Sequence, residues 1–150
     1  MKKIYILMFA FLATIANALE VGDSIPTFKI DDQFEKAQVI KADAKNIIVA
    51  GDRDASEVIR DYLLKKDKGF LQKNNSYYIA DISGMPSLIT KFFALPKMQD
   101  YPFSILLVSE EQSKSFTKKE GQITVYSIEN GKVSNKEFIK TEKELDTVFN

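Results

Sequence analysis

The chain has 150 residues, with 21 basic and 21 acidic side chains and no cysteine, histidine or tryptophan. Hydrophobic residues make up 45% and charged residues 28%, a composition typical of one folded domain. The missing residue types exclude thiol–disulfide exchange, thiolate catalysis, thiolate metal sites and every mechanism that needs an imidazole base or ligand.

The first eighteen residues have the pattern of a secretory signal peptide. A pair of lysines precedes an apolar run over residues 4–16, and Ala16-Asn17-Ala18 provides a small-x-small cleavage site. As a helix the run would extend about 20 Å, which is too short for a hydrocarbon core of about 30 Å. We therefore expect residues 1–18 to be cleaved from a single domain over residues 19–150. The mature chain is then periplasmic or secreted, and the compact signal is typical of bacteria.

The charge of the mature domain limits its partners. Removing residues 1–18 leaves 19 basic and 21 acidic side chains, with no basic stripe for nucleic acid and no polybasic cluster for anionic lipid. We expect no nucleic-acid partner and no stable membrane anchor after cleavage.

The N-terminal half predicts a hairpin and then alternating strands and helices. Residues 21–30 suggest a short edge strand, and residues 34–40 a second strand paired with it. The apolar run Asn46–Ala50 is typical of a central parallel strand. A helix follows, with apolar side chains every three or four positions over residues 55–63, and then a strand over residues 77–82.

A second helix is predicted to begin at Pro86 and to end before Pro96. Residues 103–108 predict another buried strand, and residues 109–121 a polar surface loop. The second helix is expected to pack inward through four apolar side chains: Leu88, Ile89, Phe92 and Phe93.

The C-terminal part predicts a hairpin and a last helix. Strands over residues 123–128 and 133–139 flank Asn130-Gly131, the strongest short signal for a two-residue type I′ turn. Thr141–Glu144 is a capping box that opens a helix.

This order of elements is that of the thioredoxin fold. Val21–Phe28 resembles the V-G-D-x-x-P-x-F segment of peroxiredoxins and other thioredoxin-like envelope proteins, and Tyr101-Pro102 resembles the cis-proline position beside their active-site loop. The chain is similar to small periplasmic proteins of the YtfJ type. The resemblance implies an α/β fold with a central mixed β-sheet flanked by helices and an N-terminal β-hairpin.

The chain departs from the redox members of that superfamily at the active-site loop. Where they carry a reactive cysteine, residues 50–56 read Ala-Gly-Asp-Arg-Asp-Ala-Ser. Thiol–disulfide oxidoreductase and peroxidase activities both need a thiolate, so neither carries over.

The best candidate binding surface is this loop together with the X-Pro segment: Asp52, Arg53, Asp54, Ser56, Tyr101 and Pro102. Open α/β sheets place ligands at the carboxyl ends of their strands, and an arginine binds carboxylate or phosphate in a bidentate manner. The simpler alternative is that the acids cap the helix, with Asp54 or Ser56 at its start, and that Arg53 pairs with one of them. A calcium loop fits poorly, because Glu57 stands where such a loop needs glycine.

These features predict a redox-inactive binding or assembly module of the cell envelope, whose partner is an envelope protein or an extended peptide. A cis Tyr101-Pro102 bond would present the Tyr101 backbone to that peptide. We assign no catalytic residue, cofactor or metal. Two alternatives stay open: a non-thiol, hydrolase-like enzyme that uses carboxylates, and a small-ligand carrier with an apolar cavity under the second helix.

Overall fold

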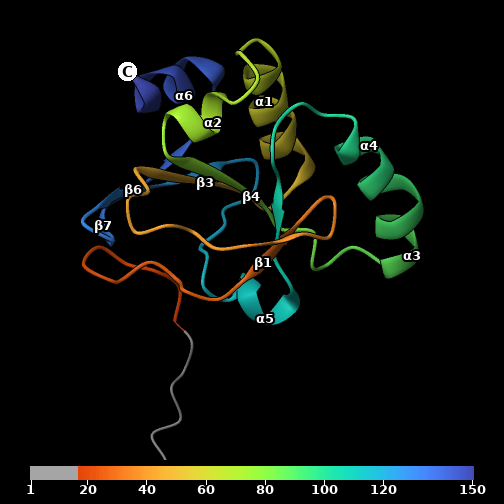
Figure 1. Cartoon of the computed structure of the whole chain (residues 1–150), viewed down its shortest axis with the longest axis horizontal. Coiled ribbons are helices and arrows are strands. Elements are labelled where there is room, and N and C mark those ends of the chain that lie inside the picture. The colour runs from red at the N-terminus through yellow and green to blue at the C-terminus, as the bar shows by residue number, and fades with distance from the viewer. Residues whose placement is uncertain (1–16) are drawn as a thin grey trace, which may run out of the picture.

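The computed structural model describes residues 17–150, so the apolar run of the predicted signal peptide lies outside the described residues. The chain forms a seven-stranded mixed sheet in the order β2-β1-β5-β4-β3-β6-β7, with helices on both faces (Figure 1). The strands are β1 (Ile30–Asp32), β2 (Ala37–Gln38), β3 (Asn46–Ala50), β4 (Ser76–Ala80), β5 (Leu106–Leu107), β6 (Ile123–Glu129) and β7 (Lys132–Ile139). The helices are α1 (Arg53–Leu64), α2 (Phe70–Lys73), α3 (Ser87–Ile89), the π-helix η1 (Thr90–Ala94), α4 (Leu95–Gln99), α5 (Glu110–Ser113) and α6 (Glu142–Phe149).

The predicted central strand is confirmed as β3, which pairs with β4 in parallel and with β6 antiparallel. Its side chains from Ile47 to Ala50 are all buried. Both faces of this strand are covered, so its sequence is a continuous apolar run rather than an alternating one.

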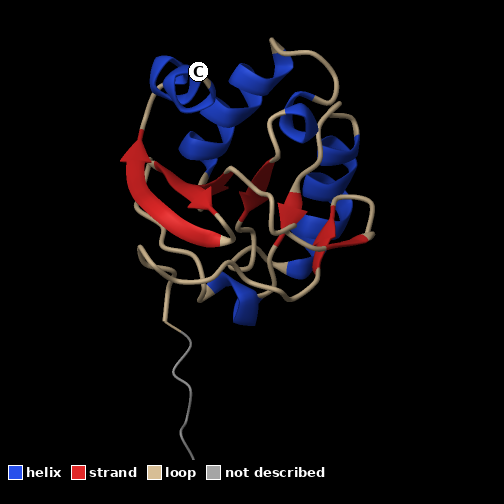
Figure 2. Cartoon of the chain, turned by 60° about the vertical axis from the view of Figure 1, so that its left-hand side comes forward, coloured by secondary structure: helices blue, strands red, loops and turns tan. Residues whose placement is uncertain are grey.

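Helices and loops cover the sheet on two sides. Figure 1 places α1, α2 and α6 over one face and α5 beneath the other, and Figure 2 shows the same separation from another angle. The core is correspondingly divided into two clusters. One contains Ile59 and Leu145 from α1 and α6, and the other contains Leu19, Ile25 and Phe116 from the opposite face.

The predicted hairpins are present at both ends of the sheet. The antiparallel pair β1–β2 supplies the N-terminal one, and the Asp32 carboxylate closes its turn by accepting the backbone N–H groups of Phe34 and Lys36. At the other end, Asn130 and Gly131 have φ values of 52° and 74°, the two positive angles that a type I′ turn requires. The expected α/β architecture is therefore confirmed.

The expected surface loop over residues 109–121 is more ordered than its polar composition suggested. Ser109 and Gln112 form a reciprocal capping box that starts α5, and Phe116 is buried at 2% exposure. The sequence contains this capping pattern, but the residues around it are polar, so the sequence predicts a loop instead of the short helix. The expected strand over residues 103–108 is in turn reduced to Leu106–Leu107.

The prediction that the second helix ends before Pro96 is wrong. The helix passes through the proline because η1 widens the turn before it, where the Leu95 N–H donates to the Thr90 carbonyl five residues back. A π-turn displaces the carbonyl groups that the proline ring would otherwise meet, so the chain continues as α4.

The prediction that this helix packs inward through its apolar face is also wrong. Leu88, Ile89, Phe92 and Phe93 are 69%, 46%, 62% and 73% exposed. The helix turns its other side, with Ala94 and Met98, toward the end of the sheet. Among residues 17–150, no helix has the length and apolar character needed to cross a membrane.

Candidate functional site

A cavity of about 660 Å³ opens at the carboxyl ends of β3 and β4. The loop after β3 and the start of α1 form one wall, and Tyr101, Phe103 and Ile105 form another. The inner side of the α3–η1–α4 helix closes the space with Ala94 and Met98. This is the edge at which open α/β sheets bind ligands.

Asp52 caps α1 and also ties the helix start to a distant segment. Its carboxylate accepts the Ala55 N–H at 2.9 Å and the Gly121 N–H. The expectation that Asp54 or Ser56 caps the helix is therefore wrong. The Ser56 hydroxyl instead donates to the Asp52 carbonyl at 2.8 Å. Asp52 has the extended backbone that an N-cap requires, and Asp54 already lies within the first turn.

Arg53 pairs with an acidic residue of its own helix, which is the simpler alternative that the sequence suggested. Its Nε donates to the Glu57 carboxylate at 2.9 Å, one helical turn away, and its side chain is 88% exposed. Both residues lie at the mouth of the cavity, whereas the exposed Asp54 does not line it. An exposed pair of this kind contributes little to stability and leaves the guanidinium available to a ligand.

The structure brings together three polar side chains that the sequence reading missed. Lys118 donates to the carboxylate of Asp81, at the end of β4, and to the hydroxyl of Ser113, which itself donates to Asp81. The aliphatic part of Lys118 lies over Gly51, where an added Cβ would come within 2.9 Å of it. Glycine at position 51 therefore makes room for this lysine. The signal that could have found Lys118 is its place just before β6, the strand that pairs with β3.

Asp81 is ionised and firmly held. Burial favours its neutral form, but hydrogen bonds from Lys118, Ser113 and Ser83 outweigh that effect and lower the pKa of the carboxyl. A carboxylate with a lowered pKa is a weak general base at neutral pH. Asp81 thus orders the cavity wall rather than offering the raised pKa that a carboxylate enzyme needs.

The aromatic wall is fixed by one buried amide. Gln33, which is 0% exposed, accepts the Ile105 N–H at 2.9 Å and donates to the Phe103 carbonyl at 2.7 Å. Tyr101 and Phe103 stack with ring centroids 5.2 Å apart. Burial raises the pKa of the neighbouring Tyr78 to about 12, so its hydroxyl is neutral at physiological pH.

The expected cis bond at Tyr101-Pro102 is wrong, because no described peptide bond is cis. The segment leads into β5, which β4 separates from β3, so it does not stand beside the loop in the way the resemblance implied. Residues 117–122, which lead into β6, hold that place through the contacts of Gly121 and Lys118. Tyr101 still reaches the cavity with its side chain, while Pro102 is exposed and does not line it.

Of the six predicted surface residues, Asp52, Arg53, Ser56 and Tyr101 line the same cavity. Their common position comes from the sheet, which places the loop after β3 across from the segment before β5. Within residues 17–150 no three histidine, cysteine, aspartate or glutamate side chains gather as a metal site would require.

The chain shares its fold with solved thioredoxin-like proteins. A Chlorobium tepidum protein assigned as the thiol:disulfide interchange protein DsbE has 15% identity and a TM-score of 0.59, covering 87% of this chain and 96% of its own. The thioredoxin domain of a Bacteroides vulgatus thiol-disulfide oxidoreductase has 17% identity and a TM-score of 0.54, covering 89% and 100%. PrxQ of Xylella fastidiosa, solved as a cysteine-to-serine mutant, has 10% identity and a TM-score of 0.56, covering 89% and 95%.

No protein-family model and no curated protein matches the chain. At these identities the structural likeness shows the fold alone. The chain is a thioredoxin-like fold without cysteine.

Proposed function

We propose that this chain is a redox-inactive assembly module of the bacterial cell envelope, related to YtfJ-type proteins, which docks another envelope protein through a helix face. The observation that carries the proposal is the outward apolar side of α3–η1–α4. This docking face consists of Leu88, Ile89, Phe92 and Phe93. Its four side chains are 46–73% exposed, and an apolar patch of large side chains on one face is typical of interaction sites.

The face has the spacing of a helix that binds in a groove. Leu88 and Phe92 are four positions apart, as are Ile89 and Phe93, so the four residues lie on one side of the helix. The helix forms the outer edge of the molecule in Figure 1, where a partner can approach it without meeting the rest of the fold.

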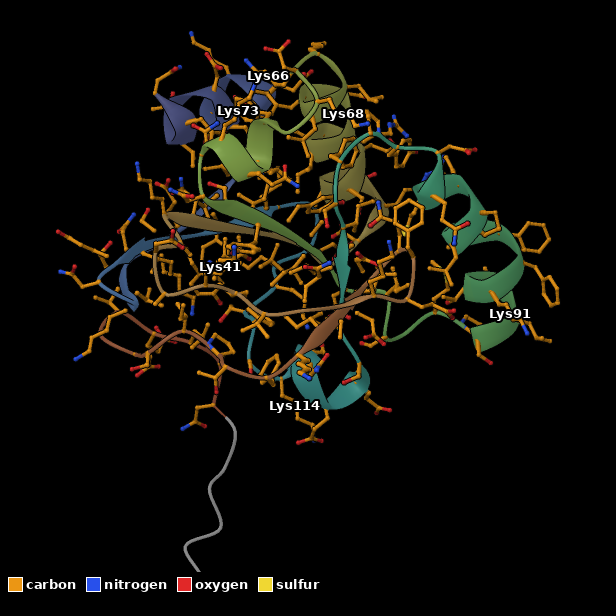
Figure 3. The ribbon with its side chains drawn as sticks, in the orientation of Figure 1. Lys41, Lys66, Lys68, Lys73, Lys91 and Lys114 are labelled. Atoms are coloured by element: carbon orange, nitrogen blue, oxygen red, sulfur yellow. The ribbon has the colours of Figure 1, made fainter. Side chains whose placement is uncertain are left out.

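Charge indicates the chemistry of the partner. Lys91 lies next to Phe92 of the docking face, and residues 82–99 contain no acidic residue. Figure 3 shows Lys91 on this helix, apart from Lys66, Lys68 and Lys73 near α1 and α2. An apolar groove with an acidic rim complements such a helix. A second copy of the chain would instead place two basic helices against each other.

Photo-crosslinking in the producing cells tests the proposal. A benzophenone amino acid replaces Phe93 in the docking face or, as a control, Phe34, which is 50% exposed in the β1–β2 turn. We expect one crosslinked protein of defined mass from position 93 and none from position 34. Replacing Phe92 by serine in the position-93 variant should remove the crosslink, whereas Lys114→Glu, directly after α5, should leave it unchanged.

Several results would contradict this docking role. They are equal crosslinking from positions 93 and 34, a crosslink to a second copy, or attachment to lipid alone. A partner whose contact surface lacks both an apolar groove and acidic residues would also refute the proposed chemistry.

A further inference from the structure

The cavity at the ends of β3 and β4 is separate from the docking face, because it lies on the other side of the same helix. Ala94 and Met98 point into it, whereas Phe92 and Phe93 do not line it. Its volume of about 660 Å³ falls in the range of small-molecule sites, roughly 300–1,000 Å³. The cavity is therefore a site distinct from the docking face.

The body of the cavity is apolar and adaptable. Tyr101 and Phe103 form a stacked wall, which the buried amide of Gln33 holds in place. Met98 of α4 and Met85, in the turn before α3, contribute flexible thioethers. Rigid aromatic rings opposite methionines suit an aliphatic chain or a flat ring rather than a polar ligand.

The acidic side chains of the lining are already committed to protein partners. Asp52 caps α1, Glu57 pairs with Arg53, and Asp81 pairs with Lys118. The cavity therefore presents no uncompensated negative charge from these three carboxylates.

Arg60 and Lys97 are the two cations of the lining that pair with none of these three carboxylates. Arg60, with 28% of its side chain exposed, forms its one ion pair within residues 17–150 with Asp61, which does not line the cavity. Lys97 makes no ion pair within residues 17–150. The lining thus joins an apolar interior to a surplus of positive charge at its mouth.

We propose that this cavity binds an amphipathic anion, whose apolar chain or ring lies against Tyr101, Phe103 and Met98 and whose acidic group meets Arg60 and Lys97. The proposal goes beyond the docking role, since it uses the opposite side of the helix. The chain would then carry a small ligand as well as contact a protein.

Calorimetric titration of the purified protein with decanoate tests the charge requirement, with decylamine and decanol as probes of equal length. We expect saturable binding of one decanoate, with decylamine binding about tenfold more weakly or worse. Lys97→Glu should weaken decanoate binding by about tenfold, because it places a negative charge at the mouth. Lys91→Glu is the matched control, since Lys91 lies on the same helix outside the cavity, and it should leave binding unchanged.

Two blocking variants locate the site. Ala94→Trp fills the cavity from the helix, and Gly84→Trp fills it from a position where an added Cβ meets no atom within 4 Å. Both should abolish decanoate binding, and Gly84→Trp should do so without loss of thermal stability. The double variant Phe92→Ser/Phe93→Ser should bind decanoate normally.

Equal binding of decylamine and decanoate would overturn the anion assignment. Unchanged binding in a stably folded Gly84→Trp variant would overturn the cavity itself. If binding were lost in Phe92→Ser/Phe93→Ser but kept in Gly84→Trp, decanoate would be adsorbing to the docking face, and the cavity proposal would fail while the docking proposal stood.

Discussion

Lys118 and Asp81 are 37 residues apart in the chain, yet they form the most buried ion pair of the described residues. The Asp81 side chain is 6% exposed and that of Lys118 27%. With Ser113, they connect the end of β4 to α5 and to the segment before β6. These three side chains thus connect three parts of the chain at the cavity wall. Removing one of them should lower the free energy of unfolding.

Asp81→Asn should destabilise the protein by about 2–3 kcal/mol at pH 7, because it leaves a partly buried ammonium without its counter-charge. The pKa of Asp81 is lowered from its ordinary 3.8, so its stabilising effect is present above that pH and is lost as the pH falls through the folded-state pKa. Urea unfolding at pH 7 and below pH 3.8 should show the difference between the two proteins shrinking in acid.

Asp146→Asn is the matched control for that measurement. Hydrogen bonds from Tyr62 and Lys66 also lower the pKa of Asp146, but its side chain is 50% exposed, so the substitution should cost less. An Asp81→Asn protein as stable as the parent at pH 7 would show that the ion pair does not hold the wall.

At the scale of elements, α1 and the α3–η1–α4 helix surround the cavity in different ways. α1 begins at a side-chain cap and buries a conventional apolar stripe that includes Ile59 and Leu63. The second helix keeps its most apolar stripe outside and gives Ala94 and Met98 to the cavity. The first helix is therefore part of the core, while the second separates a cavity from a docking face.

Asp52→Ala should cost about 1 kcal/mol or more of unfolding free energy, since it removes the cap of α1 and the acceptor of the Gly121 N–H. Arg53→Ala, by contrast, should stay within about 0.5 kcal/mol of the parent, because its ion pair with Glu57 is exposed. Chemical denaturation of both variants provides the comparison. Equal losses for the two would refute the assignment of Asp52 as the structural residue of this loop.

At the scale of the whole molecule, the sheet packs between two apolar core clusters, and the chain has no cysteine with which to form a disulfide. The N-terminal segment takes part in this packing. Leu19 is 7% exposed, and its backbone N–H donates to the Ser115 carbonyl at 2.9 Å. The predicted cleavage site thus lies directly before a residue that belongs to the fold.

Mass spectrometry of the exported protein should find Leu19 at the N-terminus, with the new amino group still able to donate to Ser115. Ala18→Arg should prevent processing, because signal peptidase needs a small residue at that position. An intact chain in the membrane fraction, or a mature chain that begins after Leu19, would contradict the prediction.

Insulin reduction and peroxide consumption by the purified protein should equal those of buffer, because both reactions need a thiolate that this chain does not contain. A thioredoxin assayed in parallel verifies that the assays respond. Catalysed turnover by the cysteine-free chain would refute redox inactivity.

The sequence by itself determined the features that depend on near neighbours. Composition excluded thiol and imidazole chemistry, Asn130-Gly131 specified a type I′ turn, and the run Asn46–Ala50 marked the central strand. Local hydrogen bonding and backbone preference also placed the cap at Thr141, whose side chain accepts the Glu144 N–H at 3.1 Å. These interactions span a few residues, so a short stretch of sequence contains the information that specifies them.

Tertiary structure decided which segments meet and which side of the second helix faces inward. Residues 117–122 rather than Tyr101-Pro102 stand beside the loop after β3, because β6 is the antiparallel neighbour of β3 while β5 lies beyond β4. Likewise, the apolar stripe that includes Phe92 and Phe93 predicted burial, but these two side chains are exposed. The stacked rings of Tyr101 and Phe103 pack against the core at this edge of the sheet instead. Strand order and competition for the core are properties of the whole chain, and no local pattern specifies them.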